Sequence, residues 1–293
     1  MRELSRLFYC KYPVLVLVML ILAPLLTGAS ITDDRSPTIN RRGLPTPYCF
    51  ANFCRQEKDE WIVGGGGWIL HLSTYADKHE QHPTEEDLVG VYFVNSSVGW
   101  VVGYNGTILR TLDGEHWEPQ SSGTDHTLKA INCVDENHCW AVGVGGVILR
   151  TEDGGQMWLP VESPVTDNLN AVDFINKDIG WAASHEGRVL RTLDGGRSWK
   201  KSESGIILFP HGLTSKGFLL AVKFANEKLG WVAGGGGLAR TTDGGVTWEV
   251  KIEEETFVGL VSRDGKNVWA IDEWGKNQCS NDGGQTWKKC PSE

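Results

Sequence analysis

The sequence predicts an all-β protein folded as a single β-propeller of four-stranded blades. Three observations lead to this fold class. A turn of the form Thr/Ser-x-Asp-Gly followed by Trp recurs along the chain, a Trp-centred strand motif recurs in step with it, and the 293 residues include 13 Trp and 36 Gly. No long helical pattern occurs outside the first 29 residues. A repeat of about 20–50 residues is typical of propellers, solenoids and related arrays.

The recurring turn, called the Asp turn below, explains where the chain reverses. Its Asp accepts hydrogen bonds from backbone N–H groups shortly after it, and its Gly residues allow the positive φ that a Cβ penalises. The Trp that follows begins the next strand and packs beneath the hairpin. We therefore expect a structural role for the Asp and Trp of each copy. The copies are Thr111–Trp117, Thr151–Trp158, Thr192–Trp199, Thr241–Trp248 and Ser280–Trp287, with Asp113, Asp153, Asp194, Asp243 and Asp282. Their Trp residues are Trp117, Trp158, Trp199, Trp248 and Trp287.

A second set of Trp residues marks the repeat independently of the Asp turns. Each unit contains four short strands separated by turn residues, which is the pattern of one blade. Six blades are therefore expected, and seven remain open if residues 30–48 and 75–87 contribute strands. Ring closure is expected because an open row would expose apolar faces at both ends. The marking residues are Trp61, Trp100, Trp140, Trp181, Trp231 and Trp269, at spacings of 39, 40, 41, 50 and 38 residues.

Taken in chain order, residues 1–29 have the composition of a signal peptide. A basic start precedes the apolar run Val14–Leu26, and small residues end at Ala29, where we expect cleavage. An uncleaved anchor is the alternative, since the run is short for a membrane span but not impossibly so. Residues 30–47 are expected to be a linker or a closing strand, and residues 48–293 the propeller. The first unit lacks the Asp turn, and an apolar insertion, Ile206–Phe218, lengthens the spacing after the fourth.

Six cysteines follow the signal segment, an even number that favours disulfides in an exported chain. They are close in sequence as pairs, and local pairing is the simplest of the 15 possible connectivities, although the others stay open. Without a Cys-x-x-Cys motif a zinc site is not expected, and we expect no cofactor. The pairs are Cys49 with Cys54, Cys133 with Cys139, and Cys279 with Cys290.

The charge balance limits the class of partner. The net charge is −9, and removing residues 1–29, which contain three basic residues and one acidic residue, takes it to −11. An acidic chain argues against nucleic acid or an anionic membrane as the main partner. We expect a monomer that binds a protein, with a glycan as a possible ligand.

The full repeat carries a family resemblance. The segment Trp140–Trp158 (WAVGVGGVILRTEDGGQMW) resembles the repeat of Asp-box propellers, and more narrowly that of the photosystem II stability/assembly factor family and its relatives. The resemblance covers about residues 48–290. It implies an exported or lumenal propeller, without catalysis, that binds new membrane-protein subunits and assists their assembly.

The same resemblance implies a binding patch of arginines on one face. The matching residues end the third strand of four consecutive units, whereas Leu72 and Cys279 stand there in the first and last units. The alternative is that each Arg pairs with acidic residues at its blade edge. The candidates are Arg110, Arg150, Arg191 and Arg240.

A carbohydrate-binding or glycoside-hydrolase-like (sialidase-type) secreted propeller is the alternative function. A glycosidase requires two carboxylates about 5–10 Å apart, but the repeat acids lie in turns, and Asp173, Asp272 and Glu273 have no evident partner. No Arg-Ile-Pro stretch of the sialidase kind occurs. We therefore expect no enzymatic activity. For a lectin, Trp68 and Trp274, which lie off the repeat, would be the residues that stack on sugars.

Overall fold

The computed structural model describes residues 38–39, 45–46, 49–56, 59–73, 78–206, 218–262, 264–272 and 277–290. The expected signal segment lies outside these residues. Within 30–47, β1 (Thr38–Ile39) and β2 (Pro45–Thr46) pair with each other as a small separate sheet. The other described regular elements are β-strands and short 3-10 turns, as the prediction of an all-β protein requires. These turns are η2 (Gly65–Gly67), η3 (Tyr104–Gly106) and η4 (Val144–Gly146).

Four sheets have four antiparallel strands each, which confirms the predicted blade. The first consists of β3 (Cys49–Gln56), β4 (Asp59–Gly64), β5 (Ile69–Ser73) and β6 (Lys78–Gln81). The second consists of β7 (Leu88–Phe93), β8 (Gly99–Gly103), β9 (Ile108–Thr111) and β10 (Trp117–Gln120). The third consists of β11 (Leu128–Cys133), β12 (Cys139–Gly143), β13 (Ile148–Thr151) and β14 (Leu159–Val161). The fourth consists of β15 (Leu169–Phe174), β16 (Gly180–Ser184), β17 (Arg188–Thr192) and β18 (Lys200–Ile206).

The expected count of six blades, or seven, is wrong, because the described chain forms five propeller sheets and the fifth has six strands. The long strand β21 pairs with β20 through its first half and with β22 through its second half. It joins the units of Trp231 and Trp269 through residues 253–256, which contain no Gly or Pro; the backbone turns locally at Glu254, where φ is 65°, without ending the strand. The sheet consists of β19 (Phe218–Phe224), β20 (Gly230–Thr241), β21 (Glu249–Ser262), β22 (Val268–Asp272), β23 (Gln278–Ser280) and β24 (Lys288–Lys289).

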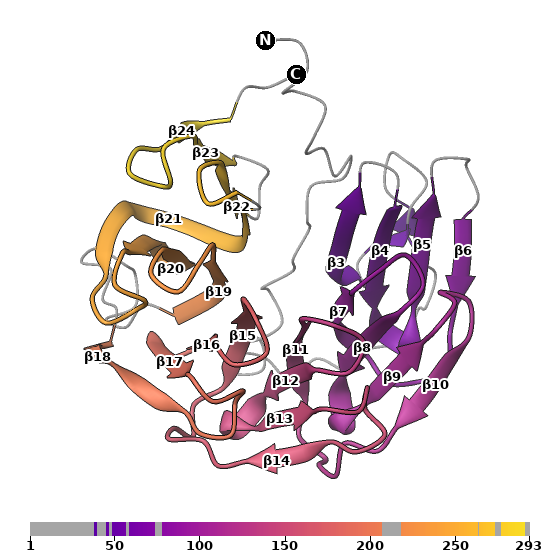
Figure 1. Ribbon diagram of the computed structural model, residues 1–293. Helices are drawn as coiled ribbons and strands as arrows, with labels where there is room; N and C mark the ends of the chain where they lie inside the picture. The colour runs from indigo at the N-terminus through magenta and orange to yellow at the C-terminus, as the bar shows by residue number, and fades with distance from the viewer. Residues whose placement is uncertain are drawn as a thin grey trace, which may run out of the picture.

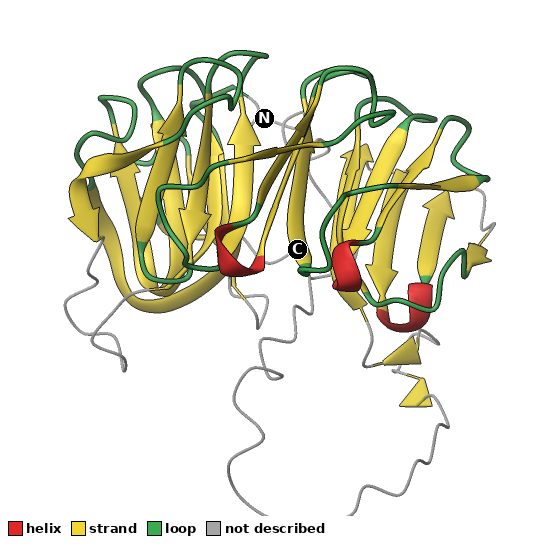
Figure 2. Cartoon of the chain, turned by 90° about the horizontal axis from the view of Figure 1, so that it is seen from below, coloured by secondary structure: helices red, strands yellow, loops and turns green. Residues whose placement is uncertain are grey.

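The sheets are arranged around a common centre (Figure 1). Their first strands β3, β7, β11, β15 and β19 contact one another in that order. Because strands alternate in direction, the Asp turns lie at one rim of the ring. The 3-10 turns between second and third strands lie at the other rim, where they appear in red (Figure 2). The rim that carries the Asp turns is called the Asp-turn rim below.

The hydrophobic core lies in the seams between neighbouring sheets. One cluster joins Trp140 and Ile148 of the third sheet to Phe174 and Trp199 of the fourth. Comparable clusters occupy the seams on either side. Four of the strand Trp residues, Trp100, Trp140, Trp181 and Trp231, are the largest fully buried side chains, and burying each ring contributes about 2–3 kcal/mol. The sheets therefore depend on their neighbours for stability.

Candidate functional site

Each Asp turn is closed by its own side chains. In the fourth sheet, Asp194 Oδ1 accepts hydrogen bonds from the Ser198 N–H at 2.9 Å and the Thr192 hydroxyl at 2.8 Å. The Gly196 N–H donates to Thr192 Oγ1 at 2.9 Å. Asp153, Asp243 and Asp282 make the same pattern of bonds, and Asp113 makes it in a turn that is one residue shorter. The carboxylates are thus occupied within the turns.

These bonds favour the ionised carboxylates. Burial raises the pKa of Asp194, but hydrogen bonds from the Ser198 hydroxyl, the Ser198 N–H and the Thr192 hydroxyl outweigh it and lower the pKa to about 2. The pKa values of Asp113, Asp153, Asp243 and Asp282 also lie below their usual range. The turns therefore hold their geometry at any pH well above these values.

We expect the chain to lose stability between about pH 4 and pH 2. A carboxylate whose folded pKa is depressed stabilises the fold above its unfolded pKa of about 3.9, and this contribution disappears as pH falls through the folded pKa. Urea unfolding midpoints measured across this interval should fall for the wild type. Asp194→Asn retains the accepting oxygen but not the charge, so its midpoint should fall less steeply. An equal slope for both proteins would contradict the assignment.

A Trp from each of two sheets is bonded to the Asp turn of the next sheet. Trp140 Nε1 donates to the Gly195 carbonyl and Trp181 Nε1 to the Gly244 carbonyl, both at 2.9 Å. Each indole also stacks on a Phe of that next sheet, Phe174 or Phe224, at a centroid distance of 3.5 Å. This Trp–turn contact fixes the position of the Asp-turn rim relative to the sheet before it.

The four candidate arginines are half-buried and lie on the Asp-turn rim. Arg240 Nε donates to the Gly283 carbonyl of the following Asp turn at 2.7 Å. Arg110 lies over the Trp100 ring at 5.1 Å, and a Cβ at Gly154 would lie 2.8 Å from its Nη1. Arg191 lies over Trp181 in the same way, at 5.7 Å. The structure therefore brings these arginines to equivalent places on one rim, each against a neighbouring element.

Of the four candidate arginines, Arg150 alone forms an ion pair with a carboxylate among the described residues. Arg150 Nη1 lies 2.6 Å from Glu152 Oε1, which also binds Arg197 of the next sheet at 2.5 Å. The hydrogen bond from Arg150 holds the pKa of Glu152 below its usual value. Glu152 thus connects the third and fourth sheets on the Asp-turn rim.

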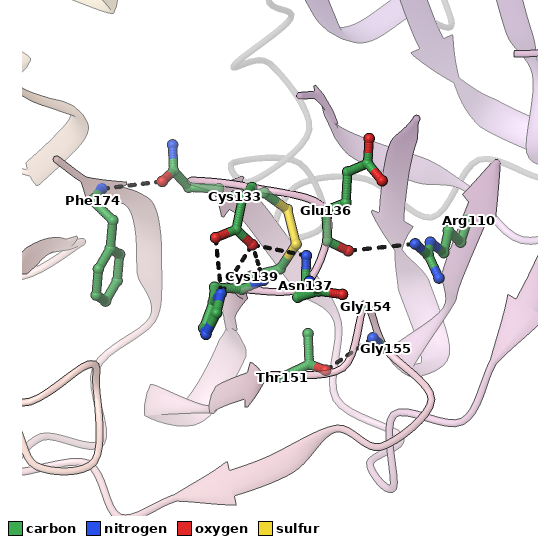
Figure 3. Close-up of a disulfide and its surroundings, with 12 residues drawn as sticks. Arg110, Cys133, Glu136, Asn137, Cys139, Thr151, Gly154, Gly155 and Phe174 are labelled. Atoms are coloured by element: carbon green, nitrogen blue, oxygen red, sulfur yellow. Dashed lines mark hydrogen bonds and ion pairs between the residues drawn. A yellow bond between two sulfur atoms is a disulfide. The ribbon is translucent and has the colours of Figure 1, made fainter. Parts of the chain in front are cut away.

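The disulfides follow the local pairing expected where the structure describes them. Cys133 is bonded to Cys139, and Cys279 to Cys290 (Figure 3 shows the first). Cys49 and Cys54 lie in β3, whose side chains are outside the described part. No group of three metal-ligating side chains occurs among the described residues.

The residues proposed for carbohydrate chemistry are largely occupied. Trp68 is buried against Ile62 and Leu70, so its ring cannot stack on a sugar. Asp173 is buried, binds Lys223 at 2.7 Å and accepts the Phe224 N–H at 2.7 Å. Asp272 is buried as well. Glu273, Trp274 and most of the insertion, residues 207–217, lie outside the described residues.

A polar groove of about 720 Å³ lies beside β9 and β10. Its lining is rich in hydroxyl and amide groups, including Asn105, Thr107, Ser122 and Thr124, and contains one carboxylate, Asp125. It is formed at the 3-10 rim rather than the Asp-turn rim. Sequence reasoning missed this groove because no motif marks it.

Sequence reasoning also missed the Phe that completes three of the seams. Phe93, Phe174 and Phe224 each end a first strand, six residues before the Gly that opens the second strand. Their constant Phe-x5-Gly spacing ahead of Trp100, Trp181 and Trp231 was the available signal.

The fold and the Asp-turn rim together define an Asp-box β-propeller, and residues 278–289 match the BNR/Asp-box repeat. Three overlapping matches, to residues 74–162, 111–206 and 156–250, extend this to most of the ring. The chain belongs to the family described as photosynthesis system II assembly factor YCF48, which confirms the resemblance seen in the repeat. No curated protein matches the chain significantly.

Solved structures show the same fold at low sequence identity. A structure described as YCF48 bound to D1 peptide is similar with a TM-score of 0.63 and 20% identity, covering 83% of this chain and 81% of that one. The GH74 enzyme of Niastella koreensis is similar with a TM-score of 0.64 and 18% identity, covering 84% of this chain but 37% of the enzyme. Within the described residues, no helix has the length and apolar character needed to span a membrane.

Proposed function

We propose that this chain is a non-enzymatic binding protein that holds a peptide segment of a membrane-protein subunit and assists assembly of its complex. Family membership is the observation that carries the proposal, since the family is described as an assembly factor. The similar YCF48 structure, described as bound to a D1 peptide, supports a peptide of the D1 type as the ligand.

The Asp-turn rim is the proposed peptide site. It presents four half-buried arginines at repeated positions, which are held by a neighbouring Asp turn, by indole rings or, for Arg150, by an ion pair with Glu152. A guanidinium that is already positioned loses less side-chain freedom when it binds a carbonyl or carboxylate of a ligand. A row of such groups suits an extended segment that crosses several sheets.

Replacing Arg110, Arg191 and Arg240 with Gln is expected to weaken binding of a synthetic D1-type peptide at least tenfold, or about 1.4 kcal/mol. Gln removes the charge without adding the repulsion that Glu would place beside backbone carbonyls. Fluorescence anisotropy with a labelled peptide and its scrambled form measures the effect, and thermal unfolding reports the fold.

Arg188→Gln is the matched control. Arg188 begins β17, at the opposite rim from Arg191 of the same strand, and is paired with Asp167. Its replacement should leave peptide affinity unchanged. Equal affinity of the triple variant and the wild type would remove the arginines from the site, and no binding by the wild type would refute the D1-type ligand.

The alternative of a glycoside hydrolase has less support. The groove beside β9 and β10 offers one carboxylate, whereas glycosidases use two on either side of the scissile bond. The similar GH74 enzyme is more than twice as long as the region that matches. We therefore propose a binding role rather than a catalytic one, and the monomeric state remains a prediction.

We further propose that the chain is exported. The composition of residues 1–29 supports a cleaved signal peptide, and disulfides persist in oxidising compartments. Mass spectrometry of the protein from its source, with peptide mapping under non-reducing conditions, should find a mature end near Ser30 and Cys133 linked to Cys139. A retained Met1 together with free thiols would contradict export.

A further inference from the structure

Three seams of the ring are filled by the same aromatic pair. Phe93, Phe174 and Phe224 each stand directly opposite a Gly at the start of the second strand. Cβ atoms at these glycines would meet the rings at 2.5, 2.5 and 2.4 Å. Each ring instead stacks on the Trp of the preceding sheet, at 4.4 Å for Trp61 and at 3.5 Å for the other two.

The seam between the second and third sheets departs from this pattern. Cys133 and Cys139 occupy the Phe and Gly positions in the same register, and their disulfide is buried. Within the described residues, no aromatic ring stacks on Trp100, the indole that faces this seam, although Arg110 lies over it as Arg191 lies over Trp181. The disulfide therefore stands where a Phe ring fills the other seams.

The loop closed by this disulfide, residues 134–138, spans the seam (Figure 3). Asn95 Nδ2 of the second sheet donates to Glu136 Oε1 at 2.7 Å, and Arg110 Nη2 donates to the Glu136 carbonyl at 3.4 Å. On the other side, the Gly154 N–H donates to the Asn137 carbonyl at 3.0 Å. The loop thus holds Arg110, a member of the proposed peptide site, against the Asp turn of the third sheet.

A disulfide can be cleaved by a reductant, whereas the Phe ring that fills the other seams does not react with one. A dithiol reductant transfers two electrons, each sulfur takes up one proton, and the dithiol becomes a disulfide. Two thiols then remain where other seams hold a ring, so Trp100 loses packing and the loop loses its covalent closure. Because both cysteines are buried, the reaction proceeds when the loop opens, and a dithiol that completes exchange within one molecule favours it.

We propose that the Cys133–Cys139 disulfide is a redox switch for the Arg110 end of the Asp-turn rim. Oxidised, it tightens the seam and keeps the rim in its binding form. Reduced, it loosens residues 134–138 and lowers affinity for the peptide. The effect on affinity rests on the proposed peptide-binding function, whereas the loosening of the seam does not.

The test compares oxidised chain with chain treated with excess dithiothreitol, with thiol counting to establish reduction. Hydrogen exchange of β8 and of residues 134–138 should accelerate on reduction, and affinity for the D1-type peptide should fall about fivefold or more. Cys133→Phe/Cys139→Gly restores the pair of the other seams, so it should bind the peptide and ignore the reductant. Cys133→Ser/Cys139→Ser should behave as the reduced wild type does, and it keeps the test informative if the first variant does not fold.

Cys279→Ser/Cys290→Ser removes the other described disulfide and should leave the response intact. The proposal is overturned if the Cys133–Cys139 bond stays closed under excess reductant, if exchange is unchanged after it opens, or if the Phe/Gly variant responds as the wild type does. Hydrogen exchange is measured on the chain without the peptide. Failure of all forms to bind peptide, with the exchange response present, would therefore count against the peptide-binding function and leave the loosening of the seam established.

Discussion

Replacing Trp181 with Ala is expected to lower the free energy of unfolding by about 3–5 kcal/mol, among the largest effects of any single change in the chain. Trp181 is fully buried, stacks on Phe224 at 3.5 Å and donates to the Gly244 carbonyl at 2.9 Å. Ala removes the stacking and the hydrogen bond, and it leaves a cavity in the seam between the fourth and fifth sheets. Guanidinium unfolding followed by Trp fluorescence measures the loss.

Two Phe variants separate the hydrogen bond from the packing. Trp181→Phe retains an aromatic ring but leaves the buried Gly244 carbonyl without its donor, which costs about 1–3 kcal/mol. Trp231→Phe is the matched control, because Trp231 is equally buried but its Nε1 has no partner within the described residues. A larger loss for Trp181→Phe supports the Trp–turn contact, and equal losses would show that packing alone holds the seam.

Replacing Gly196 with Ala is expected to cost about 2–5 kcal/mol, from two separate causes. Its φ of 74° lies in the left-handed region, which costs a residue with a Cβ about 1–2 kcal/mol. The new Cβ would also lie 2.7 Å from Trp140 Nε1, and the indole cannot retreat because it stacks on Phe174 at 3.5 Å. Urea unfolding midpoints give the cost.

Gly123→Ala provides the control for backbone strain. Its φ is 72°, almost the same as that of Gly196, but no atom lies within 4 Å of the position that a Cβ would take there. The difference between the two variants therefore measures the contact with Trp140. If Gly123→Ala is as destabilising as Gly196→Ala, the Asp turn is strained by its backbone alone and does not depend on the preceding sheet.

Much of the fold could be predicted from the sequence because the repeat contains a turn whose residues can be recognised by their type and spacing. An Asp turn needs its Thr, Asp and Gly at fixed spacing, so Thr192, Asp194 and Gly196 mark the hairpin directly. The Trp spacing then places each second strand. These signals are local, and in the second, third and fourth sheets the structure places the strands where they predict.

The blade count and the seams could not be predicted in the same way. Whether β21 ends between two units or continues through them is decided at residues 253–256, and the spacing of the Trp residues is the same in either case. The place of Cys133 and Cys139 becomes clear only beside Phe174 and Gly180 in three dimensions. Likewise, Arg240 looks like an edge charge in sequence, but in the structure it donates to a carbonyl of the next Asp turn.

The most direct test of the central claim, that the Asp-turn rim binds a peptide of a membrane-protein subunit, is hydrogen exchange of the oxidised chain with and without a synthetic D1-type peptide. We expect slower exchange at Thr111–Trp117, Thr151–Trp158 and Thr192–Trp199, with η3 and η4 on the opposite rim unchanged. Protection confined to the 3-10 rim, or no protection at saturating peptide, would contradict it.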